Sequence, residues 1–273
     1  MNTPFIRNDL FGMNRIPFLK APEKPYLDDN RNQCLRQLDT FLQTRGFAAI
    51  AGRPGNGKTA LVRYFTEALH KPSHKVIYIP FSNLSENDLL KDICSRLDIE
   101  PPHFKNKTIR AIQQRIADIQ PMNPVIVLDE MQNATSRIMD AVRLLANDNF
   151  DAGSKLSVIL IGTSEFFDKL RLAINESLTQ RITWFHRLHE LNHEGTTDYI
   201  SHSLKAVGIE HEVFEKQAVK LIYDLSGGSI RIINKIALTA MSCASTAESS
   251  VVLLEHVHTA KDQCLLMAPE IRP

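Results

Sequence analysis

Short apolar runs alternate with longer helical patterns over the first two thirds of the chain. The runs are rich in valine and isoleucine, and their apolar residues are consecutive; they span 47–52, 75–81, 124–130, 155–163 and 183–188. Consecutive apolar residues are typical of parallel strands that are buried on both faces. One of the helical patterns between them begins at a recognisable cap, Ser85 followed by Asp88. The alternation predicts an α/β core with a parallel five-stranded sheet between helices.

The strand-like runs stop after about residue 190. Four helical patterns follow, near 193–207, 214–226, 230–244 and 253–266. The first thirty residues are rich in proline, asparagine and aspartate, which predicts an irregular segment. We therefore predict three parts: an N-terminal arm over residues 1–30, an α/β core over 31–190, and a small all-helical domain over 191–273.

Composition bears on whether this chain binds nucleic acid, metal or a membrane. Its 32 basic and 31 acidic residues leave a net charge of +1, so a nucleic-acid-binding patch, if there is one, must be local. The four cysteines lie far apart without a Cys-x-x-Cys pair, which disfavours a zinc site or a disulfide framework. No run approaches the ~18 apolar residues that span a bilayer, and the first residues lack a signal-peptide pattern. We expect a cytoplasmic protein without a membrane span.

A glycine-rich loop stands between the first apolar run and the helical pattern after it. Residues 52–59 read GRPGNGKT and match G-x-x-x-x-G-K-[ST] at every fixed position. Glycine lets the backbone N–H groups approach phosphate oxygens, and the start of the helix adds partial positive charge. Lys58 would reach the β- and γ-phosphates of ATP, and the Thr59 hydroxyl would ligate Mg²⁺. The predicted nucleotide-binding residues are Gly52, Arg53, Pro54, Gly55, Asn56, Gly57, Lys58, Thr59 and Ala60.

A second candidate site element lies where the third apolar run ends in two carboxylates, Asp129 and Glu130. Ligands of open α/β sheets bind at the carboxyl ends of the strands. Asp129 would hold Mg²⁺, mostly through a water, and Glu130 would polarise the attacking water. Such a pair alone is equally consistent with a solvated strand end. The phosphate loop earlier in the chain makes the catalytic interpretation the better one.

Several further motifs are shared with a known family. GRPGNGKT, VIVLDEMQN, VRLLAN, VILIGTSEF, LTQRI and GGSIR together resemble the AAA+ ATPases of the ExeA/TnsC/MuB group. This group includes transposition-helper ATPases and the ATPase of a secretion-assembly system. The resemblance covers nearly the full chain, and the stretch 129–162 is its most specific part. It implies a P-loop AAA+ core followed by a helical lid, Mg²⁺-dependent hydrolysis of ATP, and an ATP-dependent ring or filament.

The same resemblance assigns roles to three more residues. Thr163 matches the polar residue that contacts the γ-phosphate or the attacking water; otherwise it is an ordinary strand-end threonine. Arg181 matches the arginine finger that reaches a neighbouring subunit's γ-phosphate, with Arg171 and Arg187 as alternatives and a surface ion pair as the plain interpretation. Arg231 matches the arginine that the lid carries into the nucleotide site; otherwise it is a surface arginine near a helix cap.

The N-terminal stretch FGMNRIPF resembles the segment that lines the adenine pocket in ExeA-like proteins. Ile16 and Pro17 would then pack on the base. A hydrophobic anchor for the arm is an equally good interpretation of the same residues.

The densest basic cluster of the chain contains Lys105, Lys107, Arg110 and Arg115, with no acidic residue among them. A charge run is usually a solvated helix face. In the transposition ATPases that this sequence resembles, this part of the fold faces a central channel and touches DNA. If the cluster binds double-stranded DNA, it does so through phosphates and without reading the sequence.

The resemblance leaves two candidates for the process that ATP hydrolysis would drive, which we call the load. One is transposition: the protein would bind DNA and recruit or activate a transposase. The other is an ExeA-like assembly ATPase of a secretion system, or another protein-remodelling ATPase. ExeA proteins add a membrane span and a peptidoglycan-binding part that this sequence lacks, so we expect the transposition helper. A binding module without hydrolysis is disfavoured, because Glu130 and a candidate finger are both present.

Overall fold

The computed structural model of the chain describes residues 6–19, 24–81, 84–146 and 154–265, which form two compact units. The α/β unit contains Asp29–Arg53 and Lys58–Leu188. The helical unit contains the described residues before Asp29, the loop residues Pro54–Gly57, and the described residues from His189 onward. Parts of the predicted arm (1–5 and 20–23) and of the predicted helical domain (266–273) lie outside the described residues.

Five parallel strands form the sheet of the α/β unit, as the sequence predicts. They are β1 (Gly46–Ala51), β2 (His74–Pro80), β3 (Asn123–Asp129), β4 (Ser157–Gly162) and β5 (Ile182–Arg187). Their order in space is β2-β3-β4-β1-β5. Strand β4 therefore lies between β1, which leads into the glycine-rich loop, and β3, which ends in Asp129. The carboxyl ends of these three strands meet at one edge of the sheet, where open α/β sheets bind their ligands.

Burial differs between the central and the outer strands. Strands β1, β3 and β4 are buried almost throughout, whereas residues of β2 and β5 alternate in exposure. The expectation that all five are buried on both faces is therefore wrong for the two edge strands. In β2, Ile77 and Ile79 face the core beside α4, while Val76 and Tyr78 on the other face are 38% and 41% exposed. A strand at the edge of a sheet has fewer helices over it, so one face stays open to solvent.

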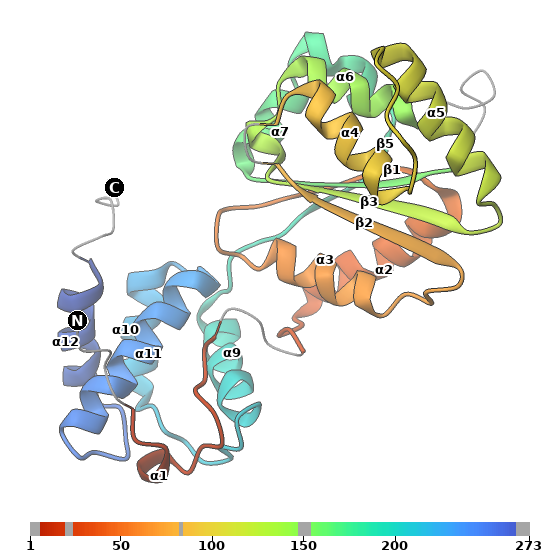
Figure 1. Cartoon of the computed structure of the whole chain (residues 1–273). Helices are drawn as coiled ribbons and strands as arrows, with labels where there is room; N and C mark the ends of the chain where they lie inside the picture. Colours follow the sequence, from red (N-terminus) through yellow and green to blue (C-terminus); the bar gives the residue numbers. More distant parts are fainter. Residues whose placement is uncertain (1–5, 20–23, 82–83, 147–153, 266–273) are drawn as a thin grey trace. The chain divides into compact units, whose positions relative to one another are not determined.

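Helices cover both faces of this sheet (Figure 1). On one face lie α4 (Glu86–Arg96), α5 (Lys105–Asp118), α6 (Ser136–Leu145) and α7 (Ser164–Leu170); on the other lie α2 (Asp29–Thr44) and α3 (Lys58–Glu67). Three short helices join the larger elements: η1 (Met131–Asn133), η3 (Ala173–Asn175) and α8 (Glu176–Thr179). The predicted cap of α4 is confirmed, because the Ser85 hydroxyl accepts the backbone N–H of Asp88 at 3.2 Å.

The helical unit contains the four predicted C-terminal helices. They are α9 (His193–Lys205), α10 (Lys216–Ser226), α11 (Ile230–Thr246) and α12 (Leu254–Leu265); the short α1 (Asn8–Phe11) precedes them in the chain. The described part of the arm up to Asp28 belongs to this unit, whereas Asp29 and Asn30 already belong to α2 of the α/β unit. Phe11 and Phe18 are buried in its core, and the Phe18 ring meets Phe214 edge-to-face with 6.2 Å between centroids. The arm is thus anchored by its aromatic residues.

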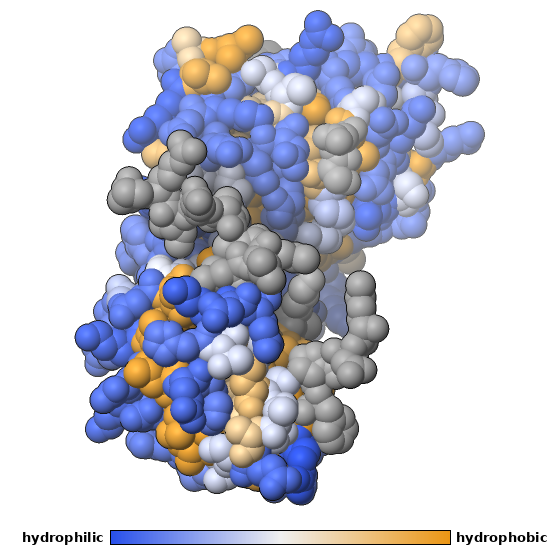
Figure 2. All heavy atoms as spheres, turned by 90° about the vertical axis from the view of Figure 1, so that its left-hand side faces the viewer, coloured by the Kyte–Doolittle hydropathy of each residue, from blue (hydrophilic) through white to orange (hydrophobic). Residues whose placement is uncertain are grey.

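The surface shown in Figure 2 is predominantly hydrophilic, and apolar residues reach it in separate patches. Among the helices in the described ranges, none is both long enough and apolar enough to cross a membrane.

Candidate nucleotide-binding site

The glycine-rich loop links the end of β1 to the start of α3. Gly55 and Gly57 have φ values of 88° and 84°, in the left-handed region where a side chain is strained and glycine is not. Lys58 opens α3 and is 9% exposed. Its Nζ donates to the carbonyl oxygens of Gly52 at 2.8 Å and Arg53 at 3.0 Å. The ammonium group therefore points into the loop, where phosphate oxygens would compete with these carbonyls.

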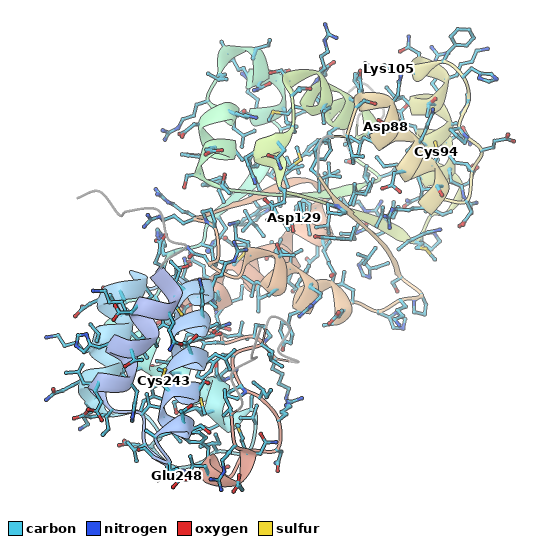
Figure 3. The ribbon with its side chains drawn as sticks, turned by 60° about the vertical axis from the view of Figure 1, so that its left-hand side comes forward. Asp88, Cys94, Lys105, Asp129, Cys243 and Glu248 are labelled. Atoms are coloured by element: carbon cyan, nitrogen blue, oxygen red, sulfur yellow. The ribbon has the colours of Figure 1, made fainter. Side chains whose placement is uncertain are left out.

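A hydroxyl and a carboxylate stand together beside the loop. The Thr59 Oγ1 donates to Oδ2 of Asp129 at 2.6 Å. Asp129 is the last residue of β3 and is 3% exposed, at the edge of the sheet (Figure 3). Oxygen donors of this type are the ligands that Mg²⁺ prefers. The two residues predicted from sequence to bind the metal are brought together, and their oxygen donors would fit a Mg²⁺ ion.

Tyr78, which the sequence analysis did not identify, completes the surroundings of Asp129. Its hydroxyl donates to Oδ2 of Asp129 at 3.0 Å. Burial and the neighbouring carboxylate raise the pKa of Tyr78 to about 12, so its hydroxyl remains a donor at neutral pH. Strand β2 pairs with β3 in a register that sets Pro80 opposite Asp129. Without that register, Tyr78 is only an aromatic residue in an apolar run.

Glu130 follows Asp129 in a strained turn. Its φ is 60°, which is uncommon for a residue with a side chain, and such outliers cluster at functional sites. Its backbone N–H donates to Oδ1 of Asp129 at 2.8 Å. Its side chain is exposed, and the carboxylate accepts a hydrogen bond from Nε2 of Gln132. The candidate base thus lies at the edge of the sheet with a defined polar partner.

Thr163 lies at the end of the neighbouring strand β4. Its backbone N–H donates to Oε1 of Gln132 at 3.2 Å, so one side chain links Thr163 to Glu130. The buried Oγ1 of Thr163 makes no hydrogen bond within the described residues. Its location beside Glu130 agrees with the expected sheet order, and the hydroxyl is available to a ligand.

Arg231 belongs to the helical unit, as do loop residues Pro54–Gly57. The Arg231 backbone N–H donates to the carbonyl oxygen of Gly55 at 3.1 Å. A Cβ added to Gly55 would lie 2.8 Å from the Arg231 Cβ and 2.9 Å from the Ser229 hydroxyl, so only glycine allows this approach. Within this unit, the start of α11 places Arg231 against the backbone of loop residue Gly55.

The three candidate finger arginines lie on different segments of the α/β unit. Arg181 is half-buried between α8 and β5, and Arg187 is exposed at the end of β5. The guanidinium carbon of Arg171 lies 4.2 Å from the centroid of the Phe167 ring, which in turn stacks on Phe185. Arg171 is therefore already engaged in an aromatic stack. Because a finger acts on another copy of the chain, the assignment to Arg181 stays a prediction.

Ile16 and Pro17 line a pocket of about 370 Å³ within the helical unit. Its walls come from the arm and from α9, with Tyr26 and Tyr199 meeting edge-to-face at 5.8 Å. Apolar and aromatic walls of this kind suit a flat base. The interpretation of these residues as a hydrophobic anchor also has support, because the adjacent Phe18 is buried in the core of the helical unit. The adenine contact of Ile16 and Pro17 stays a prediction.

The basic cluster divides over two sides of α5. Lys105 forms an ion pair with Glu86 at the start of the adjacent α4, near Asp88 in Figure 3. Lys107 and Arg110 are exposed and, three residues apart, share another face of the helix. The Lys107 ammonium lies 5.4 Å from the ring centroid of the exposed Phe104. An anionic partner would therefore meet fewer exposed basic side chains on α5 than the sequence suggests, because Lys105 is already paired.

Comparison with known proteins shows what this chain is similar to. Residues 39–170 match the family model of the AAA domain. General secretion pathway protein A of Aeromonas hydrophila is 30% identical over 243 residues, which cover 86% of this chain and 44% of that protein. The chain thus spans less than half the length of this relative.

Solved structures resemble the fold. Cdc6p from Pyrobaculum aerophilum superposes with a TM-score of 0.72 at 19% identity, over 97% of this chain and 73% of that one. Drosophila ORC bound to DNA gives 0.69 at 19% identity, over 91% and 63%. At these identities the likeness concerns the fold alone. Residues 39–170 of this chain are thus similar to the AAA domain, and the chain has the α/β AAA fold with a five-stranded parallel sheet, followed by a helical C-terminal region.

Proposed function

We propose that this chain binds ATP with Mg²⁺ and hydrolyses it to ADP and phosphate within an assembly of several copies. The observation that carries this proposal is the 2.6 Å contact between the Thr59 hydroxyl and the Asp129 carboxylate, with Glu130 next in the chain. An oxygen pair beside a phosphate loop is what a Mg²⁺-bound nucleotide requires. The match to the AAA domain supports the same ligand.

Each site residue has a definable task in this reaction. Bound Mg²⁺ supplies positive charge that neutralises the phosphate oxygens. Lys58 exchanges its two loop carbonyls for phosphate oxygens, and Glu130 accepts the proton of the attacking water. The unsatisfied Thr163 hydroxyl donates to the γ-phosphate or holds that water. Arg231, whose backbone N–H donates to the Gly55 carbonyl oxygen, is the candidate for a further cation on the phosphates.

Assembly enters through the candidate finger. Arg181 lies outside the loop and acts, in our proposal, on the nucleotide of a neighbouring copy in a ring or filament. An arginine placed in this way stabilises the charge that develops on the transferred phosphoryl group. Hydrolysis then depends on contact between copies.

For the load, we propose the assembly or remodelling of a protein complex. The support is the 30% identity to a general secretion pathway protein over most of this chain. The match covers 44% of that relative, so it compares only the shared part of the two proteins. A membrane span or a peptidoglycan-binding part outside the shared part therefore gives no reason to prefer transposition. Double-stranded DNA, with a transposase, is the second candidate; the exposed pair Lys107 and Arg110 favours it.

Two variants test the proposed hydrolysis. Lys58→Ala should abolish ATP binding, because it removes the cation inside the loop. Glu130→Gln should keep the affinity for ATP and lower turnover by about 100-fold or more, because an amide cannot act as the base. Titration with a fluorescent nucleotide and a phosphate-release assay measure both, and Glu100→Gln, at an exposed carboxylate of the same unit, is the control. Unchanged turnover in Glu130→Gln would remove the assignment of the base, and a wild type that binds no ATP would remove the proposal.

A further inference from the structure

Gln132, in the short helix η1, contacts three separate parts of the α/β unit. Its Nε2 donates to Oε2 of Glu130, and its Oε1 accepts the backbone N–H of Thr163 at 3.2 Å. Its backbone carbonyl accepts a hydrogen bond from Nζ of Lys169, which also donates to the carbonyl of Ala134 at 3.1 Å. The backbone of Gln132 is therefore fixed, and its side chain bridges the ends of β3 and β4.

The first end of this bridge restrains the candidate base. The backbone of Glu130 is held in its left-handed conformation with its N–H on Asp129 at 2.8 Å. The direction of the carboxylate then depends on its side-chain torsions and on its partner. An amide that donates to a carboxylate oxygen occupies a lone pair that would otherwise accept a proton from water. While the contact with Gln132 lasts, that oxygen of Glu130 is engaged.

The second end of the bridge meets a residue with an unsatisfied polar atom. The buried Oγ1 of Thr163 lacks a hydrogen-bond partner within the described ranges, which is energetically unfavourable. A phosphate oxygen or a water bound beside Thr163 would remove this cost. Since the N–H of the same residue is held by Gln132 at 3.2 Å, a shift of Thr163 away from Gln132 toward such a ligand would lengthen the hydrogen bond to Oε1. The amide of Gln132 is then less firmly placed against Glu130.

We propose that Gln132 is a positioning residue that holds Glu130 until the space beside Thr163 is filled, and then releases it. This inference rests on the proposed ATP hydrolysis and deepens it, since it names the side chain that couples occupancy of the site to the base. Both contacts come from one amide. A movement of the strand end at Thr163 therefore also affects the hydrogen bond between Gln132 and Glu130, which we call the hold.

The hold can be tested without turnover by ¹⁵N NMR of the Gln132 side-chain amide, assigned by its loss in Gln132→Met. In nucleotide-free protein, Glu130→Ala should shift this signal. A non-hydrolysable ATP analogue with Mg²⁺ should move the wild-type signal toward the position that it has in Glu130→Ala. A signal that ignores Glu130→Ala overturns the hold. A signal that responds to Glu130→Ala and ignores the analogue overturns the release.

Turnover gives the second readout. Gln132→Met keeps the side-chain length and removes both hydrogen bonds, so kcat should rise about threefold or more while KM stays within about twofold. The control is Gln114→Met: Gln114 also donates from Nε2 to a carboxylate, Asp118 at 2.7 Å, but on an exposed face of α5, and its loss should change neither constant.

An unchanged or lower kcat in Gln132→Met, with thermal unfolding like that of the wild type, overturns the hold. A folding defect in Gln132→Met would lower both the activity and the melting temperature. It would therefore be distinguished from the expected rise in kcat. A wild type that does not hydrolyse ATP overturns the proposed function instead. The amide signal still decides whether Gln132 binds and releases Glu130.

Discussion

Replacing Tyr78 with phenylalanine should weaken the α/β unit by about 1 kcal/mol at neutral pH. The variant loses the 3.0 Å hydrogen bond to the buried Asp129 carboxylate and little else. A hydrogen bond to a charged group contributes about 1.5–3 kcal/mol when it is buried. Tyr78 is 41% exposed, so water can replace part of the lost donor, and we expect about 1 kcal/mol, which is below that range.

The pKa of Tyr78 sets how much of the wild-type stability is lost when this side chain ionises. Burial first, and then the Asp129 carboxylate, raise this pKa from 10.0 to about 12. Two pKa units correspond to about 2.7 kcal/mol, which solvent screening at a side chain exposed to this degree reduces to about 1 kcal/mol. Because the folded pKa lies above the unfolded one, this contribution is fully present below about pH 10 and is lost as the pH rises through about 12.

Urea unfolding of the wild type and Tyr78→Phe at several pH values measures this difference. The wild type should be the more stable by about 1 kcal/mol at pH 8, and the gap should close between about pH 10 and 12. The control is Tyr64→Phe, because Tyr64 lies on α3 of the same unit and makes no side-chain hydrogen bond within the described residues. Equal stabilities at pH 8, or a gap that persists at pH 12, would refute the role assigned to the hydroxyl.

Two further predictions concern assembly and the second candidate load. Mixing Arg181→Ala copies, which keep the site, with Lys58→Ala copies, which keep the finger, should restore part of the phosphate release; a mixture as inactive as its components excludes Arg181 as a finger acting between copies. If the load is DNA, the double variant Lys107→Glu/Arg110→Glu should bind labelled duplex more weakly in fluorescence anisotropy and lower the salt slope by about two, with nucleotide affinity unchanged. Wild-type protein that ignores duplex with ATP at low salt would end the DNA candidate.

The sequence by itself determined where the strands and the main helices of this protein lie, and it predicts a nucleotide-binding loop between two of them. Consecutive apolar runs predict strands because a strand buried on both faces needs apolar side chains at every position, a local property. The loop at 52–59 and the pair Asp129 and Glu130 could be identified as candidates for a similar reason: the residue types that bind phosphate and Mg²⁺ are few, and their spacing is read along the chain. The four helices after residue 190 also follow from local periodicity.

The tertiary structure decided which of these residues become partners. Tyr78 reaches Asp129 because β2 pairs with β3 in one register, and Gln132 bridges Glu130 and Thr163 because β4 lies next to β3. The order of strands also makes β2 and β5 the edges, whose exposed faces the apolar runs do not reveal. Lys105, which the sequence groups with its basic neighbours, is paired with Glu86 on the adjacent helix. Apart from the contact between Gln132 and Glu130, these contacts join residues from different strands or helices, and their geometry depends on strand order, register and helix packing, which no local pattern encodes.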